Sequence, residues 1–206
     1  MRFNPRRNPS GLPYRNVAEC YLLYRGCIVA QIAKGGAGKY MSIPGGGIDH
    51  GETPEVGALR ELKEELGAVL RGSLKLVSVM KWDWNPEWAN TEKRKGRYMQ
   101  FRGERVYSFI GEVERFDMPT SDEGDAWKGP KTMPLKKAAL FMRNMYEKHS
   151  LPNQREYNAV KCNIISTLSA VITKVPKTKK NAKRTKRTKR TKRTKRTERA
   201  VLSQPS

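Results

Sequence analysis

Three glutamates in the first third of the chain have the spacing of a metal-binding group. Glu61, Glu64 and Glu65 stand at i, i+3 and i+4, so on a helix they share one face and lie one turn apart. Like charges at this spacing repel each other, and a bound cation would relieve the repulsion. Carboxylate oxygens with no Cys or His pair nearby suit Mg²⁺ or Mn²⁺, which commonly couple carboxylates to substrate phosphates. An ordinary solvated helix face would show the same spacing, so the surrounding residues must decide.

The helix that would carry these glutamates is expected over residues 54–66. Thr53 is a suitable N-cap, Pro54 suits the first turn, and Gly67 is a suitable C-terminal stop. The apolar positions expected to face the core are Leu59, Leu62 and Leu66.

Residues 46–68 read GGIDHGETPEVGALRELKEELGA and resemble the Nudix box. That box is a Gly, five residues, a Glu, seven residues, and then Arg-Glu-hydrophobic-any-Glu-Glu-any-Gly-hydrophobic. Only Ala68 departs, because it is small where a larger aliphatic residue is usual, and Val69 follows directly. Eight positions fixed in type and spacing are far more specific than a short glycine motif. The residues in register are Gly46, Glu52, Arg60, Glu61, Leu62, Glu64, Glu65 and Gly67.

The resemblance implies an α/β fold, an α/β/α sandwich around a mixed β-sheet, and a metal-dependent hydrolase. By transfer, Glu61, Glu64 and Glu65 would bind Mg²⁺ or Mn²⁺ together with the main-chain carbonyl of Gly45. Arg60 would orient a box glutamate through a salt bridge, and Glu52 would hold the loop against the helix. Water would attack one phosphorus of a nucleoside diphosphate linked to another group. The general base stays open between Glu61 and three acids of a later segment, which are Asp122, Glu123 and Asp125.

Three functions are compatible with these motifs. The first is hydrolysis of a small nucleotide such as a nucleoside triphosphate, ADP-ribose or a dinucleoside polyphosphate. The second is an RNA 5′-end pyrophosphohydrolase or decapping enzyme, because later segments bear a faint likeness to bacterial Nudix RNA pyrophosphohydrolases. The third is a non-catalytic nucleic-acid-binding module of the same fold, whose usual mark, a broken glutamate set, is absent.

A cluster of aromatic and basic residues after the box is the candidate for substrate binding. Base stacking on an aromatic ring contributes about 1 to 3 kcal/mol. Trp82 and Trp84 share one strand face, however, and a place in the core explains them equally well. The candidate substrate-binding residues are Trp82, Trp84, Trp88, Arg97 and Tyr98.

The remaining pattern predicts a small set of strands and helices. Residues 17–33 read as a hairpin turning at Arg25 and Gly26, and residues 34–39 as a Gly-rich loop. Strands are expected over residues 40–44, 74–84 and 104–114, with a long polar insertion over residues 85–97. Helices are expected over residues 135–148 and 154–174.

The chain divides into a flexible arm (residues 1–15), one hydrolase domain (16–174) and a basic tail (175–206). Residues 174–206 hold 15 Lys or Arg and one acid, and so contribute +14 of the net charge of +22. The triplet Lys-Arg-Thr repeats five times over residues 183–197, which predicts disorder. Such a tail is expected to contact RNA or DNA, or to serve solubility or localisation instead.

The three cysteines, Cys20, Cys27 and Cys162, lack zinc-ligand spacing and are expected to be reduced thiols. No signal peptide or membrane-length apolar segment is visible, which favours an intracellular, cytoplasmic protein, or a nuclear one in a eukaryotic host. The sequence does not indicate the oligomeric state.

Overall fold

The computed structural model describes residues 11–35, 38–120, 127, 132–148 and 152–174. The strands there are β1 (Tyr14–Tyr24), β2 (Cys27–Val29), β3 (Gln31–Gly35), β4 (Gly38–Ser42), β5 (Ala68–Leu70), β6 (Lys75–Asp83), β7 (Gly103–Phe116) and β8 (Thr132–Pro134). The helices are α1 (Pro54–Leu66), η1 (Pro86–Trp88), α2 (Glu92–Gln100), α3 (Leu135–Lys148) and α4 (Pro152–Lys174).

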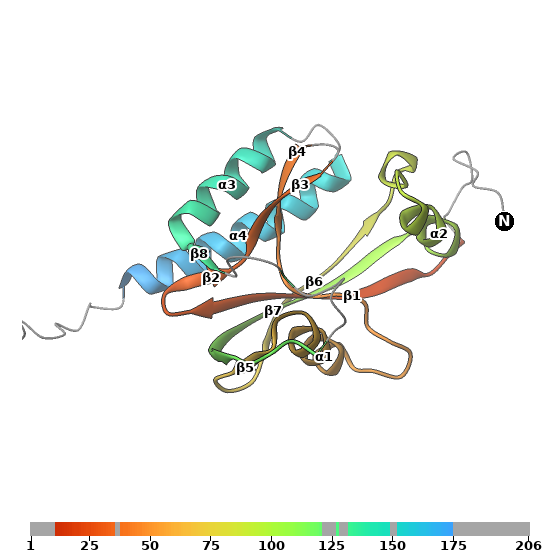
Figure 1. The fold of residues 1–206 in the computed structure, drawn as a ribbon. Helices are drawn as coiled ribbons and strands as arrows, with labels where there is room; N and C mark the ends of the chain where they lie inside the picture. Colours follow the sequence, from red (N-terminus) through yellow and green to blue (C-terminus); the bar gives the residue numbers. More distant parts are fainter. Residues whose placement is uncertain (1–10, 36–37, 121–126, 128–131, 149–151, 175–206) are drawn as a thin grey trace, which may run out of the picture. The chain divides into compact units, whose positions relative to one another are not determined.

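Two long strands, β1 and β7, form the centre of a mixed sheet (Figure 1). They pair in parallel over ten positions, from Tyr14 opposite Gly103 to Leu23 opposite Glu112. The other pairs are antiparallel: β2 with β1, β8 with β2, and both β5 and β6 with β7. The strands β3 and β4 form a separate two-stranded sheet. The predicted mixed sheet is therefore confirmed.

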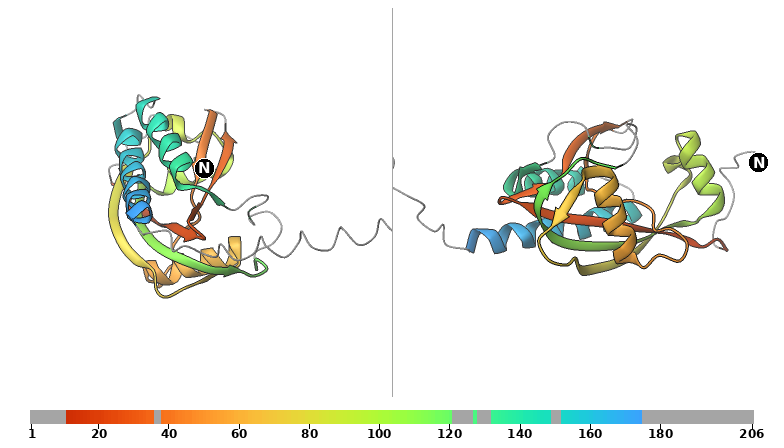
Figure 2. Two further views of the ribbon diagram at one scale, coloured as in Figure 1. Left: turned by 90° about the vertical axis from the view of Figure 1, so that its left-hand side faces the viewer. Right: turned by 60° about the horizontal axis from the view of Figure 1, so that its bottom comes forward.

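The two faces of β1 contribute to two different cores, because successive side chains of a strand point to opposite sides. Cys20 and Leu22 pack with Leu62 of α1. Tyr21 packs with Ala138 of α3 and Ile165 of α4. The helix α1 thus covers one face of the sheet, and α3 and α4 cover the other (Figure 2). This arrangement confirms the predicted α/β/α sandwich.

The first hairpin turns where the sequence predicted. Arg25 and Gly26 have positive φ angles of 50° and 78°, and Leu23 pairs with Ile28. The expected return strand is wrong in one respect: β2 ends at Val29, and the chain continues as β3 in the second sheet. The segment over residues 34–39 was expected to be a loop, but it supplies the ends of β3 and β4.

The helix α1 begins and ends as predicted. The Thr53 hydroxyl accepts a hydrogen bond from the Val56 N–H, and Gly67 closes the helix with a left-handed φ of 62°. Leu62 and Leu66 are buried, but the prediction that Leu59 faces the core is wrong, since this side chain is 43% exposed. The buried arc includes Gly57 and Ala58 instead, which turns the glutamates toward the sheet.

The polar insertion after β6 forms a short helical unit, η1 followed by α2 (Figure 1). Thr91 caps α2 by accepting a hydrogen bond from the Arg94 N–H. Tyr98 is its one buried residue, and it belongs to a third core cluster with Trp82 and Trp84.

Contacts along the chain separate Met1–Ile172 from Thr173–Ser206. Residues 1–10 of the predicted arm and the predicted disordered tail lie outside the described residues. The arm was predicted to extend to residue 15, but Tyr14 and Arg15 belong to β1, where they pair with β7. No helix in the described part of the chain combines the length and apolar character that a membrane span requires. All three cysteines are free thiols, as predicted.

Candidate active site

The glycine segment before α1 is fixed against the edge of β1 that β7 leaves free. The Ala18 N–H donates to the Gly46 carbonyl at 2.9 Å, and the Ile48 N–H donates to the Asn16 carbonyl at 3.1 Å. These main-chain bonds leave little freedom in where the glycines and the following loop lie.

At each of the three consecutive glycines, a side chain would collide with a different neighbouring group. A Cβ on Gly45 would overlap the backbone carbonyl of Ala18, and its φ of 142° is strained for other residues. A Cβ on Gly46 would overlap the Glu61 carboxylate, and one on Gly47 would overlap the Arg15 guanidinium. Gly46 and Gly47 therefore allow a carboxylate and a guanidinium to lie directly against the main chain.

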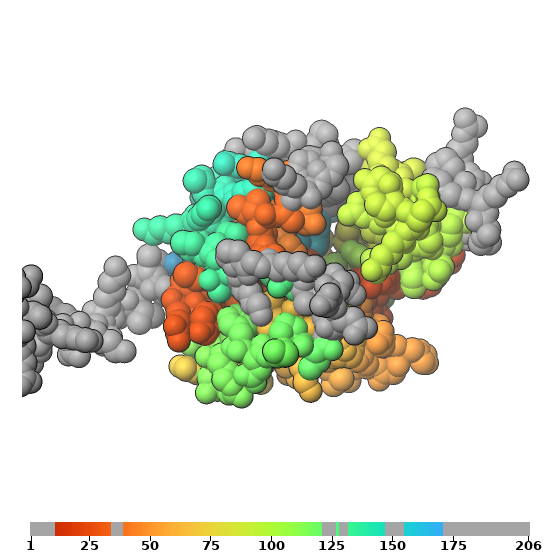
Figure 3. All heavy atoms as spheres, viewed as in Figure 1, coloured from red at the N-terminus to blue at the C-terminus, as the bar shows by residue number. Residues whose placement is uncertain are grey.

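Beside these glycines lies a pocket of about 450 Å³, here called the glutamate pocket. It brings together Glu61, Glu64 and Glu65 of α1 with side chains from β1, α2 and β7. The surface is hollowed between the β3–β4 hairpin and α2 (Figure 3), and α2 contributes to the pocket. The remaining lining residues are Arg15, Val17, Glu19, Gly45, Gly46, Gly47, Lys93, Arg97 and Glu104.

Arg60 is the centre of an ion-pair network behind the glutamate pocket. Its Nε and Nη2 atoms donate to the two oxygens of Glu52 at 2.8 and 3.0 Å. Its Nη1 atom donates to Glu61 at 3.2 Å and to Glu64 at 3.1 Å, and Nη2 also donates to the Gly47 carbonyl at 2.8 Å. One guanidinium thus joins the loop, the glycine segment and two glutamates. These are the contacts implied for Arg60 and Glu52, whose importance for catalysis stays a prediction.

Glu52→Gln is expected to reduce the acid sensitivity of folding. Hydrogen bonds from Arg60 hold the pKa of Glu52 at about 2, below its ordinary value of 4.5. A depressed carboxyl pKa stabilises the fold above pH 4.5, and this contribution disappears as the pH falls from about 4.5 through 2. Urea unfolding at pH 6 and pH 3 should show a smaller loss of stability for the variant than for the wild type. Glu55→Gln, at an exposed first-turn position, should keep the wild-type difference; an equal loss in Glu52→Gln would contradict the prediction.

The oxygen donors around the glutamate pocket fit a hard divalent cation. They include the three box carboxylates, those of Glu19 and Glu104, and main-chain carbonyls, and no Cys or His is among the lining residues. Within the described residues, no three acidic, imidazole or thiol side chains are close enough together to hold a metal ion. Glu61 and Glu64 point toward Arg60, and Glu65 accepts a hydrogen bond from the Gly45 N–H at 3.4 Å. Metal binding therefore requires rotation of these flexible carboxylates, and burial already raises the pKa of Glu61.

Cationic side chains complete the glutamate pocket. Lys93 and Arg97 stand one turn apart on α2, and Arg15 comes from β1. The pKa of Arg97 is lowered by burial and by the nearby charges of Arg15 and Arg94, so these cations crowd one another. A phosphate chain would relieve this repulsion as well as satisfy the guanidinium donors.

Two further acids of the same pocket were missed from the sequence: Glu19, which is buried, and Glu104, which is partly buried. The β1–β7 register places Glu104 opposite Arg15, and its carboxylate accepts hydrogen bonds from Arg15 at 3.5 Å and from the Trp82 indole at 3.2 Å. Burial raises the pKa of Glu104. Glu19 accepts hydrogen bonds from the hydroxyls of Tyr21 and Tyr157 and pairs with Lys161 at 2.8 Å.

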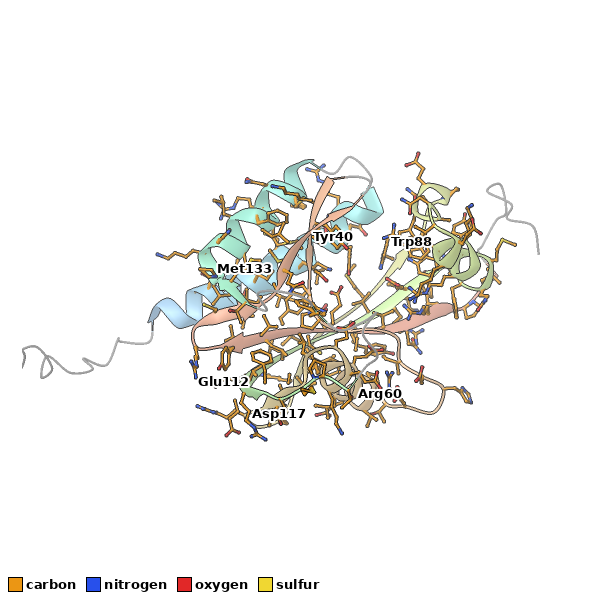
Figure 4. All side chains as sticks on the ribbon, viewed as in Figure 1. Tyr40, Arg60, Trp88, Glu112, Asp117 and Met133 are labelled. Atoms are coloured by element: carbon orange, nitrogen blue, oxygen red, sulfur yellow. The ribbon has the colours of Figure 1, made fainter. Side chains whose placement is uncertain are left out.

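The aromatic residues proposed for substrate stacking mostly belong to the core. Trp82, Trp84 and Tyr98 are 8%, 3% and 2% exposed, so the core interpretation of the two tryptophans holds and Tyr98 joins them. Trp82 stacks on Tyr157 with ring centres 5.1 Å apart, and Trp84 stacks on Trp88 at 3.7 Å. None of the four predicted aromatic residues lines the glutamate pocket, whereas Arg97 does. Trp88 and Arg60 lie on opposite sides of the central strands in Figure 4.

The family of this chain follows from a comparison with known proteins. The family model for the NUDIX domain matches residues 13–154. The chain belongs to the Nudix hydrolase family. This match covers β1, the glycine segment, α1, α2 and β7, and so includes every element that lines the glutamate pocket. The protein is accordingly a Nudix pyrophosphohydrolase, and enzymes of this family generally use divalent metal ions.

Among its relatives are bacterial proteins named RNA pyrophosphohydrolase. The Rhodospirillum rubrum protein is 30% identical over 135 residues, which is 62% of this chain and 79% of that protein. The Caulobacter vibrioides protein is 33% identical over 116 residues, covering 50% of this chain and 63% of its own length. A solved Nudix hydrolase from Nitrosomonas europaea superposes with a TM-score of 0.49 at 14% identity, covering 75% of this chain and 88% of that one.

Three acids considered as general base, Asp122, Glu123 and Asp125, lie outside the described residues. Glu61 is the one candidate that the structure describes, and it lies in the glutamate pocket. The choice among these four stays a prediction.

Proposed function

We propose that this Nudix hydrolase uses Mg²⁺ or Mn²⁺ to remove phosphate from the 5′ triphosphate end of RNA. The observation that carries the proposal is the composition of the glutamate pocket. Three box carboxylates and three cations, Arg15, Lys93 and Arg97, line one space with no aromatic ring among them. Such a pocket suits a chain of phosphates rather than a base.

In the proposed reaction, water forms a bond to one phosphorus and the adjacent phosphoanhydride bond breaks. The divalent cation, when held by Glu61, Glu64, Glu65 and the Gly45 carbonyl, supplies charge stabilisation and lowers the pKa of water. Arg15, Lys93 and Arg97 would hold the non-bridging phosphate oxygens, and Arg60 would keep Glu61 and Glu64 oriented. The attacked phosphorus lies on the RNA side of that bond, so the leaving phosphate keeps the bridging oxygen. The proton lost by the attacking water goes to the general base, and the RNA keeps a shorter 5′ phosphate end.

Two features favour RNA over a mononucleotide, although a mononucleotide was the first candidate from the sequence alone. The relatives named RNA pyrophosphohydrolase are 30% and 33% identical to this chain over 135 and 116 residues. The tail over residues 175–206 adds 14 basic residues, a charge that favours a long polyanion over a single nucleotide. A small nucleotide is therefore the second candidate substrate. The rates of hydrolysis of RNA and of small nucleotides distinguish the two candidates.

With Mg²⁺ or Mn²⁺, kcat/KM for a 5′-triphosphorylated RNA oligonucleotide is expected to exceed that for ATP, ADP-ribose and diadenosine polyphosphates. A chain ending at Lys174 should lose much of this preference, because the removed tail can no longer contact RNA phosphates. Its affinity for RNA should also depend less on salt, since each lost phosphate contact lowers the slope of log affinity against log salt by roughly 0.7 to 0.9. Released phosphate measured between 50 and 200 mM salt reports both effects.

Cleavage of a mononucleotide with RNA left intact would overturn the RNA assignment in favour of the small-nucleotide one. Tight RNA binding with no turnover of any substrate would indicate the non-catalytic module. Full RNA preference in the shortened chain would remove the tail from substrate binding while leaving the catalytic assignment in place.

A further inference from the structure

A second pocket, of about 500 Å³, adjoins the glutamate pocket and has a different chemistry. It is here called the loop pocket, because the loop between the glycine segment and α1 forms much of it. It shares Arg15 and Gly47 with the glutamate pocket, so the two spaces meet at this wall. The loop pocket is lined by Tyr14, Arg15, Asn16, Gly47, Ile48, Asp49, His50, Gly51, Glu52 and Phe101.

The acids of the loop pocket are offset by a neighbouring cation. Arg60 binds both oxygens of Glu52 and stands 3.5 Å from Asp49. Glu52 also accepts a hydrogen bond from the Asp49 N–H at 2.8 Å, which fixes the loop. The loop pocket is therefore close to neutral, whereas five carboxylates and three cations line the glutamate pocket.

Two aromatic side chains line the loop pocket, whereas none lines the glutamate pocket. Tyr14 is held in place, because its hydroxyl donates to Asp83 at 2.7 Å and the Arg102 guanidinium lies 4.9 Å from its ring centre. Phe101 packs against the tryptophan cluster and also lines the loop pocket. Exposed Asn16 and His50 add polar groups that can bond the edge of a base.

We infer that the loop pocket binds the nucleoside next to the phosphate chain that occupies the glutamate pocket. A nucleotide has this same division into a charged chain and a largely uncharged aromatic base. A volume of 500 Å³ lies in the range of small-molecule sites. Arg15, which lies against Gly47 at the shared wall, would then contact the phosphate joined to the nucleoside. The inference rests on the proposed function only in placing phosphates in the glutamate pocket.

The test compares the affinities of the full-length protein for ATP and for inorganic tripolyphosphate, measured by calorimetry with Ca²⁺ to slow turnover. Asn16→Ala and Phe101→Leu are each expected to lower the ratio of ATP affinity to tripolyphosphate affinity by about 10-fold. Asn16→Ala removes an exposed side chain, so its effect does not depend on core packing. Matched controls on α3 are Asn144→Ala, which is exposed, and Phe141→Leu, which packs against a different core cluster.

An unchanged affinity ratio in both Asn16→Ala and Phe101→Leu would overturn the nucleoside site, as would equal wild-type affinities for ATP and tripolyphosphate. This outcome differs from failure of the proposed function. If the wild type binds ATP through these residues but does not cleave triphosphorylated RNA, the RNA assignment fails and the nucleoside site stands.

Discussion

Glu64→Gln and Glu65→Gln are each expected to lower kcat/KM by on the order of 10³-fold while the protein stays folded. Glutamine keeps the shape of glutamate but lacks its negative charge, so it is a poor ligand for a hard cation. Both residues line the glutamate pocket, and α1 is anchored in the core by Leu62 and Leu66 instead. The loss should therefore appear in catalysis and metal affinity, not in folding.

Stability measurements distinguish a loss of metal binding in these variants from a loss of folding. Glutamates at i, i+3 and i+4 repel by a few tenths of a kcal/mol per pair, so removing one charge should not lower the melting temperature. Glu64 also loses an ion pair with Arg60, but it is 39% exposed, and such pairs contribute little. Calorimetric titration with Mn²⁺ should show weakened binding in both variants, and Glu55→Gln serves as the matched control. Activity of either variant within threefold of the wild type would contradict metal ligation by that residue.

The sequence predicted α1 and its caps well because those signals are local. Thr53, Pro54 and Gly67 act on backbone groups within one turn of the helix. The helix boundaries that they predict therefore do not rest on contacts with distant parts of the chain. The buried face of α1 was less predictable. Leu59 is apolar but exposed, because the position of the sheet selects the arc through Ala58.

The helix α2 and the far wall of the glutamate pocket could not be predicted in the same way. The sequence EKRKGRYMQ has no apolar period, and its one buried residue, Tyr98, packs in a cluster with Trp82 and Trp84 from another part of the chain. Arg15 and Glu104 are 89 residues apart and meet through the β1–β7 register. Arg15 also sits in a Pro-rich segment that resembles a loose arm. The box residues were thus accessible from the sequence, whereas the residues facing them were not.

Gly46→Ala is expected to preserve the fold and to lower kcat/KM by about 10²-fold. The added methyl would overlap the Glu61 carboxylate, which is the flexible end of a side chain and can move aside. A displacement of about 1 Å near the reacting groups can cost about 10²-fold in rate. Gly45→Ala is a different case, because its methyl would overlap the Ala18 backbone and a φ of 142° disfavours alanine. That variant should lose stability, whereas Gly46→Ala should melt close to the wild-type temperature.

A double-mutant cycle shows whether Gly46→Ala acts through Glu61. Glu61→Gln keeps the side chain in place but removes its charge, so it should reduce activity at least as much as Gly46→Ala. If the methyl acts only by moving that carboxylate, the double variant should be no less active than Glu61→Gln alone, since effects of residues in contact do not add. Gly11→Ala, at a glycine with open space around it, is the matched control. Multiplicative losses in the double variant would show that Gly46 serves the site by a route independent of Glu61, such as the approach of the substrate to the main chain.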